Sequence, residues 1–219
     1  MSKFRFELIG RSPLLMHADD VEKADELETW RKNPDNKKNS KAGDDRSPPW
    51  TWLTYLYVDQ HTNMLAIPAD NIMVALRHAG SQIVMKKQTT FKAASQSGLL
   101  IFDEMCAFEG AHGPVKYPDL LEIRDLPFVE QSRRAKELGF SLFVKRAAVG
   151  QSKHVRVRAR FDDWRCAGSI EVIDPVITDD VLKQLFTRAG MYAGLCDWRP
   201  SSPMRPGRFG LFDVKLKRA

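Results

Sequence analysis

The sequence predicts an α+β fold whose core follows the order βαββαβ and is interrupted by two insertions. Three observations support this prediction. Polar and apolar residues alternate near both ends of the chain, at 3–8 and 212–216, with the period of a half-buried strand. Two segments, after Pro68 and after Thr178, carry apolar residues at helical spacing. Short apolar runs between these helices, separated by turns, are typical of an antiparallel sheet.

A change in composition marks the first insertion, residues 18–50, directly after the first strand. A short helix is expected over 21–30, followed over 32–49 by a loop rich in Asp, Lys, Asn and Ser. Because a loop of this length between core elements is usually functional or disordered, we expect the insertion to be mobile. Residues 50–68 are then expected to return to the core as a β-rich stretch.

The first core helix is expected over 69–85, with Asp70 as its N-cap. Its apolar stripe consists of Ile72, Leu76, Ala79 and Ile83. A second, β-rich insertion is expected at 103–138. The strands expected after the helix are 99–102, 105–108, 120–123 and 140–144.

The clearest strand pattern lies at 154–161, where basic and apolar residues alternate, and residues 168–174 are its expected partner across a turn. The basic row is His154, Arg156, Arg158 and Arg160. An antiparallel sheet can leave one face open to water, so this row would offer cations about 7 Å apart, comparable to phosphates along a single strand. The alternative is a solvated face whose charges pair with acids such as Glu171.

The second core helix is expected to begin at Thr178, and the last strand is expected at 212–216, which completes a ferredoxin-like order. The loop between them is rich in Gly, Pro and Arg. Glycine lets a backbone approach another chain closely, and the guanidinium groups of this loop suit phosphate. These groups belong to Arg199, Arg205 and Arg208. Alternatively, Trp198 lies in the core and Arg199 pairs with Asp197.

Two further basic segments are candidates for contact with nucleic acid. Lys86 and Lys87 follow the first core helix. The loop of the first insertion carries Lys37 and Lys38 and is flanked by tryptophans, of which Trp50 is the candidate for base stacking. The acids of this loop suit a merely disordered segment equally well.

Composition sets the broad class of the protein. The chain has 34 Lys and Arg against 28 Asp and Glu, a net charge of +6 and a pI of about 9.3, which favours an anionic partner. Its three cysteines are far apart and lack a C-x-x-C pair, so we expect free thiols and no zinc site. The start of the chain carries alternating charges, and no apolar run is long enough to span a membrane, so we expect a cytoplasmic location.

Enzyme chemistry has less support. His17, Asp19 and Asp20 follow the first strand, where a nuclease could hold a metal ion or a general acid and base. The two adjacent carboxylates diverge in either a helix or a strand, and they also suit the start of a helix. The other histidines lack ligand spacing, and no phosphate-binding, dinucleotide-binding or serine-hydrolase motif is present. We therefore assign no catalytic residue, metal site or cofactor.

Four segments together resemble a known family: residues 8–17 (LIGRSPLLMH), 67–70 (IPAD), 190–200 (GMYAGLCDWRP) and 207–210 (GRFG). The chain is similar to the RAMP superfamily, and within it to the RNA-coating backbone subunits of CRISPR effector complexes and their stand-alone or phage-encoded relatives. This resemblance implies one RRM-type domain over 1–219, with 18–50 as a thumb-like insertion that reaches over a neighbouring copy. It also implies that copies oligomerise along a guide RNA, in a nucleoprotein filament that serves antiviral defence.

The resemblance implies roles for several segments. Lys86 and Lys87 would lie near the bound strand, and residues 199–208 would contact phosphates or the next protomer. Some relatives cut a target strand with an aspartate after the first strand, the region of Asp19, Asp20 and Asp25, but no motif selects one of them. The hypothesis is therefore a single-stranded nucleic-acid binding protein. Its alternatives are an endoribonuclease on the same fold, a phage-encoded mimic that caps or inhibits effector assembly, and a single-stranded DNA binding or annealing protein.

Overall fold

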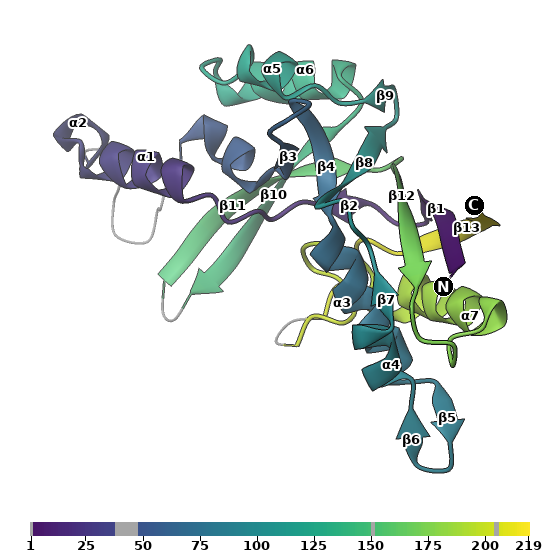
Figure 1. Cartoon of the computed structure of the whole chain (residues 1–219). Coiled ribbons are helices and arrows are strands. Elements are labelled where there is room, and N and C mark those ends of the chain that lie inside the picture. Colours follow the sequence, from purple (N-terminus) through teal and green to yellow (C-terminus); the bar gives the residue numbers. More distant parts are fainter. Residues whose placement is uncertain (1, 38–47, 150–151, 204–205) are drawn as a thin grey trace.

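The computed structural model describes residues 2–37, 48–149, 152–203 and 206–219 (Figure 1). The predicted α+β class is confirmed, because an antiparallel sheet and several helices form one connected structure. The main sheet has the strand order β13-β1-β12-β8-β4-β3. Two short strands lie off this order: β7 pairs with β12, and β9 pairs with β8. Its strands are β1 (Ser2–Gly10), β3 (Val58–Asp59), β4 (Met64–Pro68), β7 (Leu99–Leu100), β8 (Met105–Gly110), β9 (Gly113–Pro114), β12 (Arg165–Val172) and β13 (Phe212–Arg218).

Helices cover one face of this sheet, as Figure 1 shows for α3, α4 and α7. Their bounds are α3 (Ala69–Gly80), α4 (Lys92–Ser97), α7 (Asp179–Arg188) and the π-helix η2 (Ala189–Ala193). The rings of Phe6 on β1 and Phe186 on α7 lie 5.5 Å apart, which ties helix to sheet. The predicted cap of the second core helix is confirmed, since the Thr178 hydroxyl accepts from the Val181 N–H at 3.3 Å.

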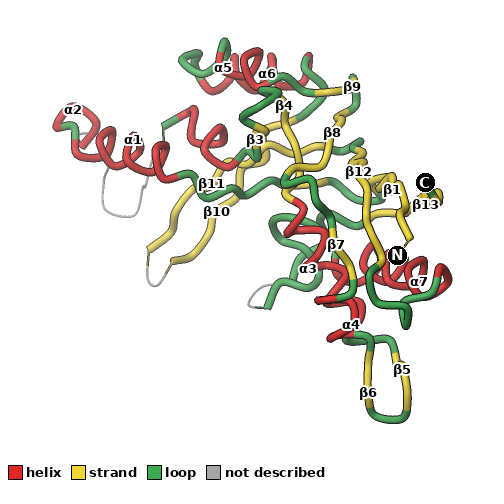
Figure 2. The backbone as a smooth tube through the Cα atoms, viewed as in Figure 1, coloured by secondary structure: helices red, strands yellow, loops and turns green. Residues whose placement is uncertain are grey.

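The first core helix is shorter than predicted and begins without a side-chain cap. Pro68 is its N-cap residue, and Asp70 lies in the first turn. The helix ends at Gly80, where the returning chain packs closely enough to require glycine: a Cβ at Gly80 would lie 2.9 Å from the Phe91 carbonyl oxygen. The segment between them forms a small hairpin, β5 (Val84–Lys86) and β6 (Thr89–Thr90), which projects from the body (Figure 2).

A second sheet has the order β10-β11-β2, with β10 (Ser141–Val149), β11 (Ser152–Phe161) and β2 (Leu14–Leu15). The strand predicted at 154–161 is confirmed, but its predicted partner is wrong. Residues 168–174 begin within β12, whose two edges are filled by β1 and β8. β11 pairs instead with β10 and β2, and the β10–β11 hairpin extends away from the main sheet in Figure 1.

Two segments predicted as strands are helical. Residues Pro49–Tyr55 form the 3-10 helix η1, and residues Tyr117–Leu121 form α5. Each has a proline in its first turn, where the ring presets φ and no N–H is lost from the hydrogen-bond ladder. A further helix, α6 (Phe128–Glu137), occupies the end of the predicted second insertion.

The helix predicted at 21–30 is confirmed as α1 (Val21–Lys32), and it is followed by α2 (Pro34–Lys37). Asp20 is its N-cap and accepts from the Lys23 N–H at 3.2 Å. Figure 1 shows α1 and α2 as an arm at the edge of the molecule. An ion pair between Glu26 and Arg124 connects this arm to the turn between α5 and α6.

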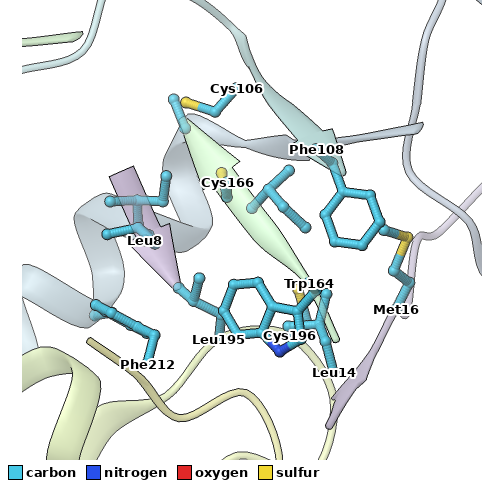
Figure 3. Packing of buried hydrophobic residues seen from close by; sticks show 14 of the residues in the cluster. Leu8, Leu14, Met16, Cys106, Phe108, Trp164, Cys166, Leu195, Cys196 and Phe212 are labelled. Atoms are coloured by element: carbon cyan, nitrogen blue, oxygen red, sulfur yellow. The ribbon is translucent and has the colours of Figure 1, made fainter. Parts of the chain in front are cut away.

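One apolar core lies between the two sheets and the helices. Figure 3 shows Phe108 of the main sheet next to Met16, and Leu14 of β2 beside Trp164. Leu8 and Phe212 lie on the other side of the same cluster, toward Leu195. The rings of Phe108 and Phe161 are 4.9 Å apart and join the main sheet to the second sheet. All three cysteines of the chain are buried in this core as free thiols: Cys106, Cys166 and Cys196.

Candidate nucleic-acid interface

The basic row of β11 shares its face of the second sheet with residues of β10. Phe143 lies directly opposite Arg158, and Lys145 lies directly opposite Arg156. Directly opposed residues of an antiparallel pair project from the same face. This face, called here the basic hairpin face, therefore carries Phe143, Lys145, Arg156, Arg158 and Arg160.

The C-terminal loop, defined here as residues 194–203 and 206–211, covers part of the basic hairpin face. Trp198 and Phe209 pack on Phe143, with ring centroids 6.0 and 5.6 Å away. The loop needs unusual backbone conformations, because φ is 61° at Cys196 and 47° at Trp198. Such angles are uncommon in residues with a Cβ, so side-chain contacts must hold the loop in this shape.

Arg158 is buried beneath this loop, so its predicted open position is wrong. The side chain is 2% exposed, and its Nε donates to Asp197 Oδ2 at 3.1 Å. Its guanidinium carbon lies 3.5 Å from the centre of the Tyr55 ring. A buried cation needs such partners because it has lost its hydration. Arg158 therefore joins three segments of the fold.

Asp197 is the centre of this buried polar cluster. Its Oδ2 lies 3.7 Å from His17 Nδ1, and its Oδ1 accepts from the Trp198 N–H at 3.0 Å. Burial opposes ionisation of the carboxyl, but the hydrogen bond and charge of His17, together with Arg158, outweigh it and lower the pKa of Asp197. The predicted alternative pair between Asp197 and Arg199 is not formed.

Two neighbours of the cluster are held neutral. Burial raises the pKa of Tyr57 to about 12, and its hydroxyl donates to the His17 carbonyl oxygen at 2.6 Å. Burial likewise raises the pKa of the Cys196 thiol to about 12. Asp197 is thus ionised beside the neutral Tyr57 and Cys196 side chains.

The outer part of the basic hairpin face remains accessible. Lys145 is exposed, and its Nζ lies 4.0 Å from the centre of the Trp198 ring, in cation–π geometry. Arg156 beside it is half-buried, and no acidic partner of Arg156 is found among the described residues. Arg160 is 35% exposed and pairs with Asp162 at 2.6 Å. Lys145, Arg156 and the Trp198 ring therefore form the candidate contact surface.

The arginines of the C-terminal loop differ in their roles. Arg199 is half-buried and donates to the Cys196 carbonyl oxygen at 2.8 Å and to Ser201 Oγ at 3.1 Å, so it braces the loop. Arg208 is exposed and stands next to Phe209. Arg208 is thus an accessible cation of the loop, whereas Arg199 is already engaged.

Several predicted site residues cannot be placed on this surface. Arg205 and Lys38 lie outside the described residues, and the side chains of Lys37 and His154 do as well. Trp50 is placed, but the prediction that it stacks on bases is not supported by its position. It is 9% exposed and is covered by the Arg124 guanidinium, 4.8 Å from the ring centre.

Lys86 and Lys87 lie on a separate projection, the β5–β6 hairpin. Both are exposed, and Val84 beside them is 66% exposed. The sequence has no acidic residue between Asp70 and Asp103, so the lysines of the hairpin have no acidic neighbour in the sequence. It forms a second candidate contact with an anionic ligand.

The acidic residues after β1 differ in their surroundings. Asp20 caps α1 and lies 3.2 Å from Lys23 Nζ, while Asp25 is exposed on the helix. Asp19 and Asp20 both line an open pocket of about 510 Å³ that also includes Tyr57 and Met105. Across the described part of the chain, His, Cys, Asp and Glu side chains form no group of three that would suit a metal ion.

Comparisons with known proteins do not identify a family for the chain. No protein-family model matches the chain, and no curated protein matches it. Within the described ranges, no helix has both the length and the apolar character to cross a membrane.

Sequence reasoning missed two parts of the surface. Lys145 lies in a strand that was recognised only by its apolar residues, and its position opposite Arg156 depends on the pairing of β10 with β11. The contact between Asp197 and Arg158 spans 39 residues. In an alternating basic row, a buried arginine and an exposed one look the same in sequence. No local signal therefore showed that Arg158 is the buried one.

Proposed function

We propose that this protein binds single-stranded nucleic acid, with RNA as the expected form, along the basic hairpin face and the C-terminal loop. The observation that carries the proposal is the group formed by Lys145, Arg156 and Trp198, in which accessible cations stand beside a partly exposed indole. Proteins that bind single strands without sequence preference combine such cations, which neutralise phosphates, with aromatic rings on which bases stack. The net charge of +6 supports the same partner.

The strand order supports a ferredoxin-like core for this proposal. β13, β1, β12 and β8 lie side by side and antiparallel. In chain order these four core strands are β1, β8, β12 and β13. The last, β13, lies beside the first, β1, and the third, β12, lies between β1 and β8. Helices α3 and α7 connect β1 to β8 and β12 to β13. The proposal treats 1–219 as one domain in which 18–50 and 103–138 are insertions.

The resemblance to RAMP backbone subunits extends the proposal to assembly. Several copies would oligomerise along one strand, as a backbone subunit of a CRISPR-like effector does, in the cytoplasm and with other effector subunits as further partners. Projecting segments supply candidate contacts between copies: the α1–α2 arm and the two hairpins. A mimic that caps an effector would use the same segments but would bind RNA weakly by itself.

The test is a pair of charge reversals on folded protein. We expect K145E/R156E to weaken binding of a labelled, unstructured 30-nucleotide RNA by more than about tenfold at moderate salt, because two phosphate contacts become repulsive. The control K183E/R188E makes the same change of charge on two exposed residues of α7. Equal affinity of the two variants would refute the proposed surface, and the same titration with DNA distinguishes the two nucleic acids.

One arrangement favours the endoribonuclease alternative. His17 contacts the ionised Asp197, and Asp19 lines the neighbouring pocket, so an imidazole and a carboxylate lie near a space open to solvent. Incubation of end-labelled RNA with the protein, with and without H17A, tests this function. Cleavage that H17A abolishes would establish it, whereas intact RNA after incubation with the wild type would remove it.

A further inference from the structure

We infer that Asp197 is a positioning residue of the proposed surface: it holds Trp198 and the C-terminal loop against the β10–β11 hairpin without contacting the ligand. This inference rests on the proposed function, because it explains how the proposed surface keeps its shape. The inference thus gives a negatively charged residue an indirect role in the binding of a polyanion.

Asp197 connects three segments that are far apart in the sequence. Its N–H donates to the Leu15 carbonyl oxygen at 2.9 Å, which fixes the loop to β2. Its Oδ2 accepts from Arg158 Nε at 3.1 Å, which fixes the loop to β11. Its Oδ1 accepts from the Trp198 N–H at 3.0 Å, which orients the next residue.

The geometry leaves little of this cluster for a ligand. Arg158 is 2% exposed and the Asp197 side chain 16%. The Tyr55 ring covers the Arg158 guanidinium, 3.5 Å from the ring centre. Both charges are therefore engaged with each other and with the fold, and neither is free to meet a phosphate.

The contacts of Asp197 compensate for a strained backbone. Cys196 and Trp198 on its two sides have φ of 61° and 47°, the left-handed region that residues with a Cβ rarely occupy. Such conformations persist only where surrounding contacts enforce them. Loss of the carboxylate is expected to release both residues toward ordinary conformations.

Release of Trp198 would disturb the surface itself. The Trp198 ring supports the Lys145 ammonium at 4.0 Å and packs edge-on against Phe143 at 6.0 Å. Without this ring in place, Lys145 loses its fixed position beside Arg156. A change at Asp197, beneath this surface, would thus alter the spacing of cations and ring on it.

The test compares D197N with K145A/R156A in titrations of a labelled 30-nucleotide polyuridine RNA at several salt concentrations. K145A/R156A removes two phosphate contacts, so the slope of log K against log salt should become shallower by about 1.4. D197N should weaken binding about fivefold or more at every salt concentration with the slope unchanged, because the contacts are displaced together. Simple electrostatics predicts the opposite, since D197N makes the protein more positive.

A second variant guards against misfolding. D197N leaves the buried Arg158 charge without its partner, whereas R158Q/D197N removes both charges and keeps the net charge of the protein. It should likewise weaken binding with an unchanged slope. Affinity equal to or above that of the wild type in either folded variant would overturn the inference. If neither variant folds, the cluster is a folding determinant, which also overturns it.

A measurement without ligand separates this inference from the proposed function. Limited trypsin digestion of the full chain should cut after Arg208 at least about fivefold faster in D197N than in the wild type, because local opening of the loop exposes the bond before buried Phe209. Arg199 and Arg205 are each followed by proline, and trypsin does not cut such bonds. If the wild-type protein does not bind the RNA, the proposed function fails, and the digestion still shows whether Asp197 holds the loop. Equal digestion rates would overturn the inference even if RNA binds.

Discussion

At the scale of single residues, the charges of the basic row differ sharply in environment. Arg158 is buried against Asp197 and Tyr55, Arg160 is paired with Asp162, and Arg156 is half-buried beside exposed Lys145. Strand alternation places these residues on one face, but only tertiary packing decides which of them reaches solvent. The same residue type thus serves the fold at one position and is available for binding two residues away.

This difference predicts the stability of two matched variants. R158A should lower the free energy of unfolding by about 3–5 kcal/mol, because it removes a fully buried side chain and breaks its ion pair with the largely covered Asp197 carboxylate. R156A, on the same face, should change it by less than about 0.5 kcal/mol. Urea unfolding measures both. Similar losses in the two variants would show that Arg158 is not the buried partner described here.

The ionisation of Asp197 predicts a pH dependence. Its pKa is lowered in the folded state, so the unfolded chain binds the proton more readily. The stabilisation is therefore fully present above the ordinary aspartate pKa and is lost as pH falls through the lower folded value. Urea unfolding between pH 7 and pH 3 should show a smaller loss of stability in D197N than in the wild type. Parallel curves for the two proteins would contradict this assignment.

At the scale of elements, the C-terminal loop and the β5–β6 hairpin extend the function beyond the β10–β11 hairpin. The loop is packed closely enough that a Cβ at Gly207 would lie 1.8 Å from the Trp198 carbonyl oxygen. The β5–β6 hairpin, in contrast, projects from the body with exposed lysines at its turn. The first element depends on tight packing, and the second depends on charge.

The loop predicts a defect from a small substitution. In G207V the valine side chain forces the backbone at 207 away from the Trp198 carbonyl oxygen and so changes the shape of the loop. RNA affinity should therefore fall about fivefold or more, which corresponds to about 1 kcal/mol of binding free energy. S202V on the same loop is the control. Fluorescence anisotropy measures binding, and thermal melting reports folding. A lowered melting temperature with unchanged affinity would mean that the loop serves only the fold.

The β5–β6 hairpin predicts a defect without loss of stability. K86E/K87E changes exposed residues, so the free energy of unfolding should stay within about 0.5 kcal/mol of the wild type. RNA affinity should fall, and the fall should shrink as salt rises, because screening weakens exposed charges. An affinity equal to that of the wild type at low salt would exclude this hairpin from the interface.

The sequence predicted the elements better than their contacts. Alternation and caps identified β1, β11, α7 and β13, because these signals are local. The pairing of β11 was missed because any of several strands can satisfy its edges. Trp50 was misassigned because an aromatic residue beside a charged loop looks the same in sequence whether it is buried or exposed.

At the scale of the whole molecule, the two sheets place the candidate surface at the edge of one continuous core. The main sheet and its helices hold both termini together, since the Ala219 N–H donates to the Lys3 carbonyl oxygen at 2.9 Å. The β10–β11 and β5–β6 hairpins project from this scaffold (Figure 1), whereas the C-terminal loop packs against it through buried Leu195 and Phe209. This arrangement leaves the two hairpins free to contact a nucleic-acid strand and further copies of the chain.

The most direct test of the account is the mass of the protein mixed with a 30-nucleotide unstructured RNA, measured by size-exclusion chromatography with light scattering at moderate salt. The account predicts particles that contain RNA and several protomers, and these particles should dissociate as salt rises. A 25.0 kDa monomer that elutes apart from the RNA would contradict it.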